Sequence, residues 1–465
     1  MQTIIDKFFK KNWQITLVVL LAFVLRISLI TINPPSLNWD EVSHGYNAYS
    51  IIKTGRDEWG ELLPAIFRAY GDYKLPVYIY LTSISIAAFG LNAFAVRLPS
   101  VIAGVVTVVF TYLVTLELFK KKKKQSSFNP GHLALLSALL VAIEPWSFFL
   151  SRGAFEANVA LSFIVAGIYY FLKGTKSSRY LPAAAILLGL SVWTYNSARI
   201  IVPVFTTLLM FLYRFEIKEM YRKSSKYLKI SVAVALLLFL PMLWQLINPV
   251  GQARYSWVSI IDEGAIAQIN EARNTSNLNE TVKVALYNKG TYFVKEFVSN
   301  WASHFSGEFL FTRGGSHYQF SVPGHGLIFS INAILLLGGI IFLLKKKDRR
   351  AFVILGWFYL GSIASSLTRE APHVLRSITI LPAPMILTSY GAIKAFSWLR
   401  KRSKVILKLF VLFYMFILVL YFGRYLKEYF NNYRVEYSWS WQYGYGQMVD
   451  YLKNYYQDYD KIVVT

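Results

Sequence analysis

Residues 97–124 read RLPSVIAGVVTVVFTYLVTLELFKKKKK. The apolar part of this stretch, residues 97–119, is about as long as the ~20 residues that a helix needs to cross ~30 Å of hydrocarbon. The lysines from Lys120 to Lys124 follow it directly. The stretch therefore predicts a transmembrane helix that ends in a strongly basic connection.

The composition of the whole chain agrees with a membrane protein. Of the 465 residues, 55% are hydrophobic and 16% are charged, and 49 Lys and Arg against 25 Asp and Glu give a formal charge of +24. A DNA-binding protein can be this basic, but a soluble fold of this size needs more charged surface. We therefore expect neither a soluble single domain nor a nucleic-acid partner. Because the chain has no cysteine, it has no disulfide framework and no thiol chemistry.

Similar apolar runs recur along the chain and predict about eleven transmembrane helices. The first, about 13–32, is interpreted as a retained helix and not as a secretory signal, because it runs into Asn33-Pro34-Pro35 without a small-x-small cleavage site. The others are expected at about 97–119, 132–150, 155–172, 181–197, 200–213, 229–247, 326–344, 351–366, 377–393 and 405–423.

Residues 75–91 are apolar enough to cross as well, but the distribution of charge favours the outer interface for them. With this segment at the interface, every strongly basic connection falls on one side, as the positive-inside rule requires of short cytoplasmic loops. If it crossed, the rule would fail from Lys120 onward. The basic connections are the N-terminus, 120–124, 173–179, 214–229, 345–350 and 400–404. The N-terminus is therefore expected in the cytoplasm.

This threading divides the chain into a transmembrane domain, residues 1–424, and an outer tail, residues 425–465. Two long loops of the domain, about 33–96 and 248–325, are expected outside, where they carry interfacial helices and functional residues. The tail ends in the strand-like run Lys461-Ile462-Val463-Val464-Thr465. It is either a naturally short tail or the beginning of a soluble domain that this chain does not contain.

Two adjacent acids, Asp40 and Glu41, follow the first predicted helix by only a few residues. Acids at a membrane surface are costly unless they are solvated or used in function, although acids at the start of a helix also suit the helix dipole. The same loop continues with Gly71-Asp72-Tyr73-Lys74-Leu75-Pro76 and then with Phe94-Ala95-Val96-Arg97-Leu98-Pro99.

Together, the acidic pair, the Lys-x-Pro sequence at an interfacial helix and the Phe-Ala-x-Arg-Leu-Pro entry to the next helix resemble the membrane glycosyltransferases of the GT-C fold. The nearest groups are bacterial enzymes similar to protein O-mannosyltransferases and the aminoarabinose transferases of lipid A. The resemblance is specific over about residues 10–200, looser to about 395 and absent from the tail. It implies an all-α polytopic protein of the bacterial cytoplasmic membrane, an undecaprenyl-type polyprenyl-phosphate sugar donor and an active site outside the cytoplasm.

The resemblance assigns roles to the residues of the first outer loop. It makes Asp40 the general base that takes the proton of the acceptor hydroxyl, with inversion at the sugar, and Glu41 an orienting neighbour. It makes Lys74 the cation that binds the carrier phosphate, where a cation stabilises the charge that develops as the bond breaks. Without the motif, Lys74 would be interpreted as a lysine that extends toward the interface.

Further candidates lie in the other predicted outer turns. Glu156 resembles the second acid of the family's site, and Arg152 either lines the cavity or forms an ion pair with Glu156 at i, i+4. Glu144 competes with Glu156 but lies nearer the body of its helix. Tyr195 and Arg199 resemble residues that contact a phosphate or a sugar in relatives, while a plain turn with an interfacial aromatic residue is the alternative.

Residues 367–376, LTREAPHVLR, resemble another element of the bacterial enzymes and place three cations in a short outer loop, against the charge rule. Because arginine matches phosphate oxygens well, Arg376 and His373 join Lys74 as candidates for the carrier phosphate. The loop 248–325 is expected to cap the cavity, with His304 as a lining residue. The spacing of its histidines fits no metal motif, so no cofactor is predicted and a divalent metal has no support.

Three functions are consistent with these features. The leading hypothesis is a glycosyltransferase whose partners are the lipid-linked donor, membrane lipids and an acceptor protein, lipid or glycan. A transporter or flippase of lipid-linked sugars is the alternative, but transporters place polar residues near the membrane midplane, whereas these candidates gather at one surface. A non-catalytic subunit would not require an acidic pair facing a cluster of cations. The enzyme hypothesis predicts that Asp40, Lys74, Glu156 and Arg376 converge on one cavity.

One intramembrane charge has a separate prediction. Arg26 lies inside the first predicted helix, about six residues from its outer end. Intramembrane charges are costly and are usually solvated at the interface or paired. A charge at such a position is by default a hypothesis of function, and for Arg26 extension to the outer surface or pairing with an outer acid is an equally favoured alternative.

Overall fold

The computed structural model describes residues 2–120, 128–223, 225–247 and 258–463. Its regular structure is helical apart from one short hairpin, in which β1 (Phe67–Ala69) pairs antiparallel with β2 (Asp72–Lys74). The predicted mostly helical architecture is therefore confirmed for the described part of the chain.

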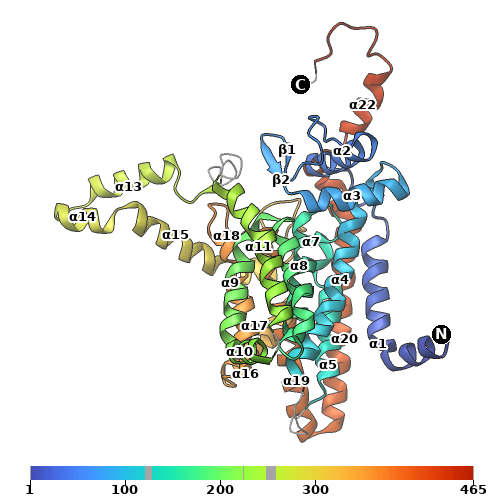
Figure 1. Cartoon of the computed structure of the whole chain (residues 1–465), viewed down its shortest axis with the longest axis vertical. Coiled ribbons are helices and arrows are strands. Elements are labelled where there is room, and N and C mark those ends of the chain that lie inside the picture. The colour runs from blue at the N-terminus through green and yellow to red at the C-terminus, as the bar shows by residue number, and fades with distance from the viewer. Residues whose placement is uncertain (1, 121–127, 224, 248–257, 464–465) are drawn as a thin grey trace.

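A bundle of helices forms the body of the molecule (Figure 1). Its helices are α1 (Gln2–Ile27), α4 (Ala93–Phe119), α5 (Pro130–Ile143), α7 (Glu156–Gly174), α8 (Leu181–Val192), α9 (Asn196–Leu212), α11 (Lys226–Ile247), α16 (Ala333–Leu344), α17 (Arg349–Leu360), α19 (Ala383–Arg402) and α20 (Lys404–Lys427). The other α-helices are α2 (Trp39–Thr54), α3 (Pro76–Phe89), α6 (Pro145–Leu150), α10 (Arg214–Lys223), α13 (Glu263–Thr275), α14 (Glu280–Leu286), α15 (Lys289–Ser303), α18 (Ile363–Ser366), α21 (Arg434–Glu436) and α22 (Tyr445–Lys453).

The two ends of the bundle differ in charge and in structure. Basic connections gather at the lower end in Figure 1, near α10, the α16–α17 turn and the α19–α20 junction. The upper end holds α2, the hairpin and α3, and these helices lie across the ends of the long ones (Figure 1). Pro76 favours the start of α3 because a proline at the first helical position loses no hydrogen bond. The arrangement agrees with an interfacial α3.

The predicted number of membrane-spanning helices, eleven, is not confirmed. Among the described residues, five helices are long and apolar enough to cross a bilayer, or six if α9 and α10, bent by 76°, form one span. The five are Ala93–Phe119, Glu156–Gly174, Lys226–Ile247, Ile378–Arg402 and Lys404–Glu436. Four other predicted spans overlap shorter apolar helices of 10 to 17 residues, namely Asn12–Ile27, Pro130–Ile143, Ser178–Val192 and Ser330–Leu344.

Glu144 and Pro145 show how a break in a predicted span is stabilised. The predicted span 132–150 breaks there into α5 and α6. The buried Glu144 carboxylate accepts a hydrogen bond from the N–H of Phe329 at 2.7 Å and another from the side chain of Asn332. These bonds satisfy polar groups of the irregular chain before α16, which would otherwise be unpaired in an apolar surrounding. Glu144 therefore has a structural role at a distance from the outer turns.

Arg26 also stabilises the break between α5 and α6. Its guanidinium is fully buried and donates to the carbonyls of Val141 and Ala142 at the end of α5, each at 3.0 Å. Gly104 makes room for it, since a Cβ there would lie 2.7 Å from Arg26 Nε. Both predictions for Arg26 are wrong: it neither reaches the surface nor pairs with an acid, because the open end of α5 supplies acceptors nearby.

The tail predicted to begin at residue 425 starts inside a continuous helical segment. α20 runs directly into a π-helical turn, Glu428–Tyr433. Tyr429, Tyr433 and Trp441 are fully buried against the bundle. Residues 425–441 therefore pack with the bundle, and α22 then extends away from it (Figure 1). The predicted terminal strand is not formed at 461–463, and residues 464–465 lie outside the described ones.

Candidate active site

Asp40 is the second residue of α2, and local hydrogen bonds fix the start of this helix. Asn38 accepts a hydrogen bond from the backbone N–H of Glu41, and the Glu41 carboxylate accepts one from the N–H of Asn38. This reciprocal capping box satisfies two N–H groups that a helix otherwise leaves unpaired. Asp40 projects from the first turn, where the helix dipole favours a carboxylate, and 42% of its side chain is exposed.

Glu41 lies behind Asp40, away from the cavity, and its partner is Arg97 on α4. Both side chains are buried, and the guanidinium donates to both carboxylate oxygens at 2.9 Å. The N–H of Ala154 donates to the same carboxylate at 2.8 Å. Arg97 also donates to the carbonyls of Ile30, Pro34 and Ser36. The two acids thus separate: Asp40 faces the cavity, while Glu41 ties α2 to α4 and to the chain that leaves α1.

Lys74 is the last residue of β2 and lies beside Asp40. Its ammonium is 2.7 Å from Oδ1 of Asp40, and 10% of its side chain is exposed. Burial lowers the pKa of Lys74, but the carboxylates of Glu156 and Asp40 outweigh this effect and leave the pKa above its ordinary value. Lys74 is therefore a fixed positive charge next to the candidate base.

Glu156 begins α7, and its carboxylate forms a hydrogen bond with Nε2 of His44 on α2 at 3.1 Å. His44 is fully buried, and its Nδ1 has no partner among the described residues. Sequence reasoning missed His44, although it follows Asp40 by four residues and therefore shares its face of α2.

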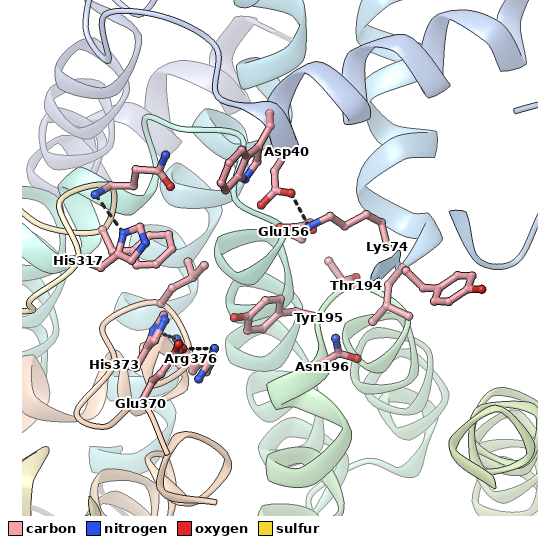
Figure 2. A pocket seen from close by; sticks show the side chains of 16 residues that line it. Asp40, Lys74, Glu156, Thr194, Tyr195, Asn196, His317, Glu370, His373 and Arg376 are labelled. Atoms are coloured by element: carbon pink, nitrogen blue, oxygen red, sulfur yellow. Dashed lines mark hydrogen bonds and ion pairs between the residues drawn. The ribbon is translucent and has the colours of Figure 1, made fainter. Parts of the chain in front are cut away.

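These groups converge on one cavity of about 220 Å³ near the upper end of the bundle (Figure 2). Its walls come from α2, the hairpin, the start of α7, the α8–α9 turn and the segments that precede α16 and α19. The lining residues are Trp39, Asp40, Tyr73, Lys74, Leu75, Glu156, Thr194, Tyr195, Asn196, His317, Gln319, Phe320, Glu370, His373, Leu375 and Arg376. The predicted convergence of Asp40, Lys74, Glu156 and Arg376 on one cavity is confirmed.

Arg376 and His373 approach from the opposite wall to Asp40 and Lys74 (Figure 2). The Arg376 guanidinium donates to Glu370 at 2.7 Å and to the hydroxyl of Thr368 at 3.0 Å. The backbone N–H of Arg376 donates to Nδ1 of His373 at 3.3 Å, which orients the imidazole. Sequence reasoning missed Glu370, which holds this cation in place at the cavity.

Tyr195 also lines the cavity, from the turn between α8 and α9, whereas Arg199 does not. Burial raises the pKa of Tyr195 above its ordinary value, so its hydroxyl stays protonated and can donate. Arg199 lies one turn further along α9 and donates to Gln245 of α11 at 3.1 Å. Tyr195 precedes the first residue of α9 and has an extended backbone conformation, so helical spacing does not place it on the same face as Arg199, and only Tyr195 of this pair reaches the cavity.

Arg152 and His304 do not line the cavity, contrary to expectation. Arg152 is fully buried and donates to the hydroxyl of Tyr429 at 3.2 Å, while Glu156 pairs elsewhere. Arg152 also donates to the carbonyls of Leu25, Arg26, Ser28 and Asn33. His304 is fully buried, between the carbonyl of Asn300 and the hydroxyl of Ser365, each at 2.7 Å. Both side chains satisfy polar groups of packed segments.

The second outer loop covers the cavity only in part. Its helices α13, α14 and α15 project sideways from the bundle (Figure 1). The chain after α15 reaches the cavity through His317, Gln319 and Phe320. The rings of His317 and Phe320 stack at 4.3 Å, and Phe320 contacts the ring of His373 at 5.1 Å. Within the described residues, no three His, Asp or Glu side chains are grouped as metal ligands.

The arrangement combines a partly exposed carboxylate, a buried ammonium and a guanidinium around one space. A carboxylate positioned in this way takes a proton from a bound hydroxyl. Fixed cations stabilise negative charge on a phosphate as it leaves. The site is therefore equipped for transfer from a phosphate ester to a hydroxyl group at one end of a membrane bundle.

The sequence matches a known protein family over part of its length. Residues 74–244 match the family described as dolichyl-phosphate-mannose-protein mannosyltransferase. An uncharacterized protein of Aquifex aeolicus is 23% identical over 390 residues, which cover 84% of this chain and 74% of that protein. The matched family segment includes Lys74, Glu156 and Tyr195 but begins after Asp40.

Solved structures agree with the family match at the level of fold. The oligosaccharyltransferase of Archaeoglobus fulgidus, tethered with an acceptor peptide, has a TM-score of 0.55 at 16% identity over 92% of this chain. The archaeal oligosaccharyltransferase AglB from Archaeoglobus fulgidus, in complex with an inhibitory peptide and a dolichol-phosphate, has a TM-score of 0.53 at 16% identity and the same coverage. This chain spans just over half, 56%, of the archaeal chain. The chain has the GT-C fold and resembles glycosyltransferases of the protein mannosyltransferase type.

Proposed function

We propose that this GT-C chain is an integral membrane glycosyltransferase. It transfers a sugar from a polyprenyl-phosphate carrier of the undecaprenyl type to an acceptor hydroxyl, with inversion at the anomeric carbon. The observation that carries the proposal is the 2.7 Å contact between Asp40 and Lys74 in a cavity whose far wall holds Arg376. The family match over residues 74–244 and the GT-C fold support it.

In the proposed reaction, Lys74, Arg376 and His373 bind the carrier phosphate. Asp40 takes the proton of the acceptor hydroxyl, and the acceptor oxygen forms a bond to the anomeric carbon. The bond from that carbon to the phosphate oxygen breaks, and its electron pair leaves with the phosphate. The cations stabilise the charge that the phosphate gains, and attack from the opposite face inverts the carbon.

The contact between Asp40 and Lys74 couples donor binding to the activity of the base. A phosphate that binds the Lys74 ammonium competes with Asp40 for it. The Asp40 carboxylate, once released from the ammonium, can accept a hydrogen bond from the acceptor hydroxyl. Binding of the donor therefore prepares Asp40 for proton transfer, while Glu156, held by His44, keeps a second negative charge near Lys74.

An apolar groove supports a lipid donor. It lies between α3, α4, α7 and α8 and is lined almost entirely by apolar side chains. Val159, one turn after Glu156 on α7, lines its upper part, and Tyr170 lines its lower part. Tyr170 follows Val159 by 11 positions, a rise of about 16 Å at ~1.5 Å per residue. We assign this groove to the polyprenyl tail.

A second cavity gives the acceptor a route to the site. It adjoins the first through His317, Glu370 and His373, which line both. Its other walls carry hydroxyl, carboxylate and guanidinium groups together with three glycines, Gly314, Gly315 and Gly324. Such a polar, backbone-rich wall suits a hydroxyl-bearing acceptor, a protein, lipid headgroup or glycan.

The membrane orientation follows from the charge of the two ends. We assign the lower, basic end to the cytoplasm by the positive-inside rule. The cavity with Asp40 then opens on the outer side of the bacterial cytoplasmic membrane, where a polyprenyl carrier presents its sugar.

Reconstitution tests the proposal. The protein in liposomes is given polyprenyl-phosphate sugars and a panel of hydroxyl acceptors, and sugar transfer is measured for wild type, Asp40→Asn and Lys74→Ala. We expect Asp40→Asn to lose at least ~100-fold in kcat, the lower range for a general base, and Lys74→Ala to weaken both kcat and donor binding. Glu61→Gln and Lys53→Ala, on the same side but outside the cavity and exposed, are the matched controls.

Two outcomes would contradict the proposal. Transfer by Asp40→Asn at the wild-type rate would remove Asp40 as the base. Movement of the lipid-linked sugar across the vesicle membrane without any transfer would favour the flippase alternative.

A further inference from the structure

A further cavity, separate from the two described above, lies at the opposite end of the bundle from Asp40. Its walls are the end of α4, the start of α5, the end of α7 and α19. Along α4, Glu117 of this cavity is 20 residues from Arg97, or about 30 Å at ~1.5 Å per residue. The cavity is therefore separate from the candidate active site, and its function does not depend on the one proposed above.

Three cations line this cavity: Lys120, which follows the end of α4, Lys173 of α7 and Arg400 of α19. Its single acid, Glu117, forms an ion pair with Lys176, which is not part of the lining. Among the described residues, neither Lys120 nor Arg400 has a carboxylate partner. Within the described part of the chain, the cations that line the cavity therefore outnumber its one acid.

Apolar side chains complete the wall. Leu113 and Leu116 of α4 are half-buried, and the aromatic rings of Phe128 and Tyr169 also line the cavity. Lys173 lies over the ring of Tyr169 at 5.8 Å, which holds its ammonium at the boundary between the polar and apolar parts. The cavity therefore combines basic groups with an apolar wall between membrane helices.

We propose that this cavity binds an anionic phospholipid, with the headgroup phosphate among Lys120, Lys173 and Arg400 and an acyl chain along Leu113 and Leu116. Basic pockets between transmembrane helices bind anionic headgroups, and each basic residue near such a lipid contributes ~1 kcal/mol. A free phosphate ion would use the cations but not the apolar wall. A neutral phospholipid would use the wall but bring no net charge to the cations.

Lipid titrations test this site directly. Purified protein in a neutral detergent is titrated with phosphatidylglycerol, phosphatidylcholine or inorganic phosphate, and the apparent dissociation constant is taken from the rise in melting temperature. We expect phosphatidylglycerol to stabilise the wild type more strongly than the other two. Lys173→Ala and Arg400→Ala should each weaken the affinity for phosphatidylglycerol by about fivefold, and the double variant should weaken it by about 25-fold. These values follow from ~1 kcal/mol per cation, since ~1.4 kcal/mol is a tenfold change in affinity.

Matched variants separate a site from general attraction. Lys404→Ala removes an exposed lysine at the same end but outside the cavity, and we expect it to leave the affinity unchanged. Lys120→Gln, at an exposed position where folding is not at risk, should weaken the affinity like the alanine variants. The melting temperatures without lipid show whether each variant folds.

Three results would overturn the proposal. Equal stabilisation by phosphatidylcholine would remove the role of the cations. Equal stabilisation by inorganic phosphate at the same concentration would make this an ion site without a lipid. A loss of affinity in Lys404→Ala as large as in Lys173→Ala would reduce the effect to the overall charge of this end.

Discussion

Replacing Arg97 with methionine removes the partner of a buried carboxylate. Glu41 is 1% exposed, and in the wild type it accepts four hydrogen bonds, two of them from the Arg97 guanidinium. Breaking a buried pair by removing one partner costs about 3–5 kcal/mol, because the other charge is left uncompensated. We therefore expect Arg97→Met to lower the free energy of unfolding by about that amount.

A double-mutant cycle isolates the pair. Glu41→Gln alone leaves the Arg97 charge buried and should cost a similar amount. The double variant has neither buried charge, so it should cost little more than either single change, and the coupling energy should be about 3 kcal/mol, the upper range for residues in contact. The double variant should remain less stable than wild type, because the carbonyls that Arg97 serves stay without a donor.

The assay is chemical unfolding in mixed micelles, followed by tryptophan fluorescence. The matched control is the exposed pair Arg313 and Glu308, 3.7 Å apart with 75% and 69% of their side chains exposed. Arg313→Met and Glu308→Gln should show no measurable coupling, since exposed pairs gain little. Additive costs for Arg97→Met and Glu41→Gln, within about 0.5 kcal/mol, would refute the view that these two residues stabilise the region as one unit.

Three further predictions concern the other buried polar groups. Glu144→Ala should cost about 1–3 kcal/mol by leaving the N–H of Phe329 unpaired, whereas Glu144→Gln, which keeps an acceptor oxygen, should cost less; thermal unfolding of both variants checks this. Burial lowers the pKa of His304 to about 4, below its ordinary 6.5, so the unfolded chain binds the extra proton in that window. The stability from neutral His304 is full above pH 6.5 and falls by up to about 3 kcal/mol toward pH 4, and unfolding midpoints against pH should flatten in His304→Gln. Arg152→Met should destabilise the protein by several kcal/mol without weakening donor affinity per folded molecule, because its guanidinium serves backbone carbonyls and Tyr429; a weaker donor Kd with unchanged stability would return Arg152 to the cavity wall.

Local patterns in the sequence predicted part of the candidate site. The motif around Asp40 and Lys74 led to two residues that contact each other, although the chain separates them by 34 positions. The spacing of Asn38 and Glu41 is also a readable capping box, which points to a structural use of the second acid. The position of His44, one turn after Asp40, was an available signal as well.

Long-range packing was not readable from the same patterns. Arginine in a membrane turn has many equivalent partners in sequence, and only the fold brings Arg97 to Glu41 and Arg152 to Tyr429. Hydropathy measures how apolar a segment is and not whether its backbone stays helical. A break such as the one at Pro145 is therefore invisible when distant groups satisfy the freed polar atoms.

The connection from α1 to α2 explains why these arginines are buried. It is an irregular segment among apolar helices, and backbone carbonyls in such surroundings need donors. Arg152 and Arg97 together donate to seven carbonyls at the end of α1 and in this connection. The planar fork of a guanidinium suits this task, since it offers five N–H groups in a fixed geometry.

This arrangement also determines where the candidate base stands. Arg97 belongs to α4, and Arg152 lies in the turn that leads to α7, the helix that begins with Glu156. The segment before Asp40 is therefore held by the same two helices that form the wall of the cavity. Because Arg97 also holds Glu41, its hydrogen bonds fix both sides of Asp40 and keep the carboxylate within reach of Lys74. Arg152, which sequence reasoning assigned to the cavity, and Arg97 thus lie behind the cavity, where they position the acid that faces it.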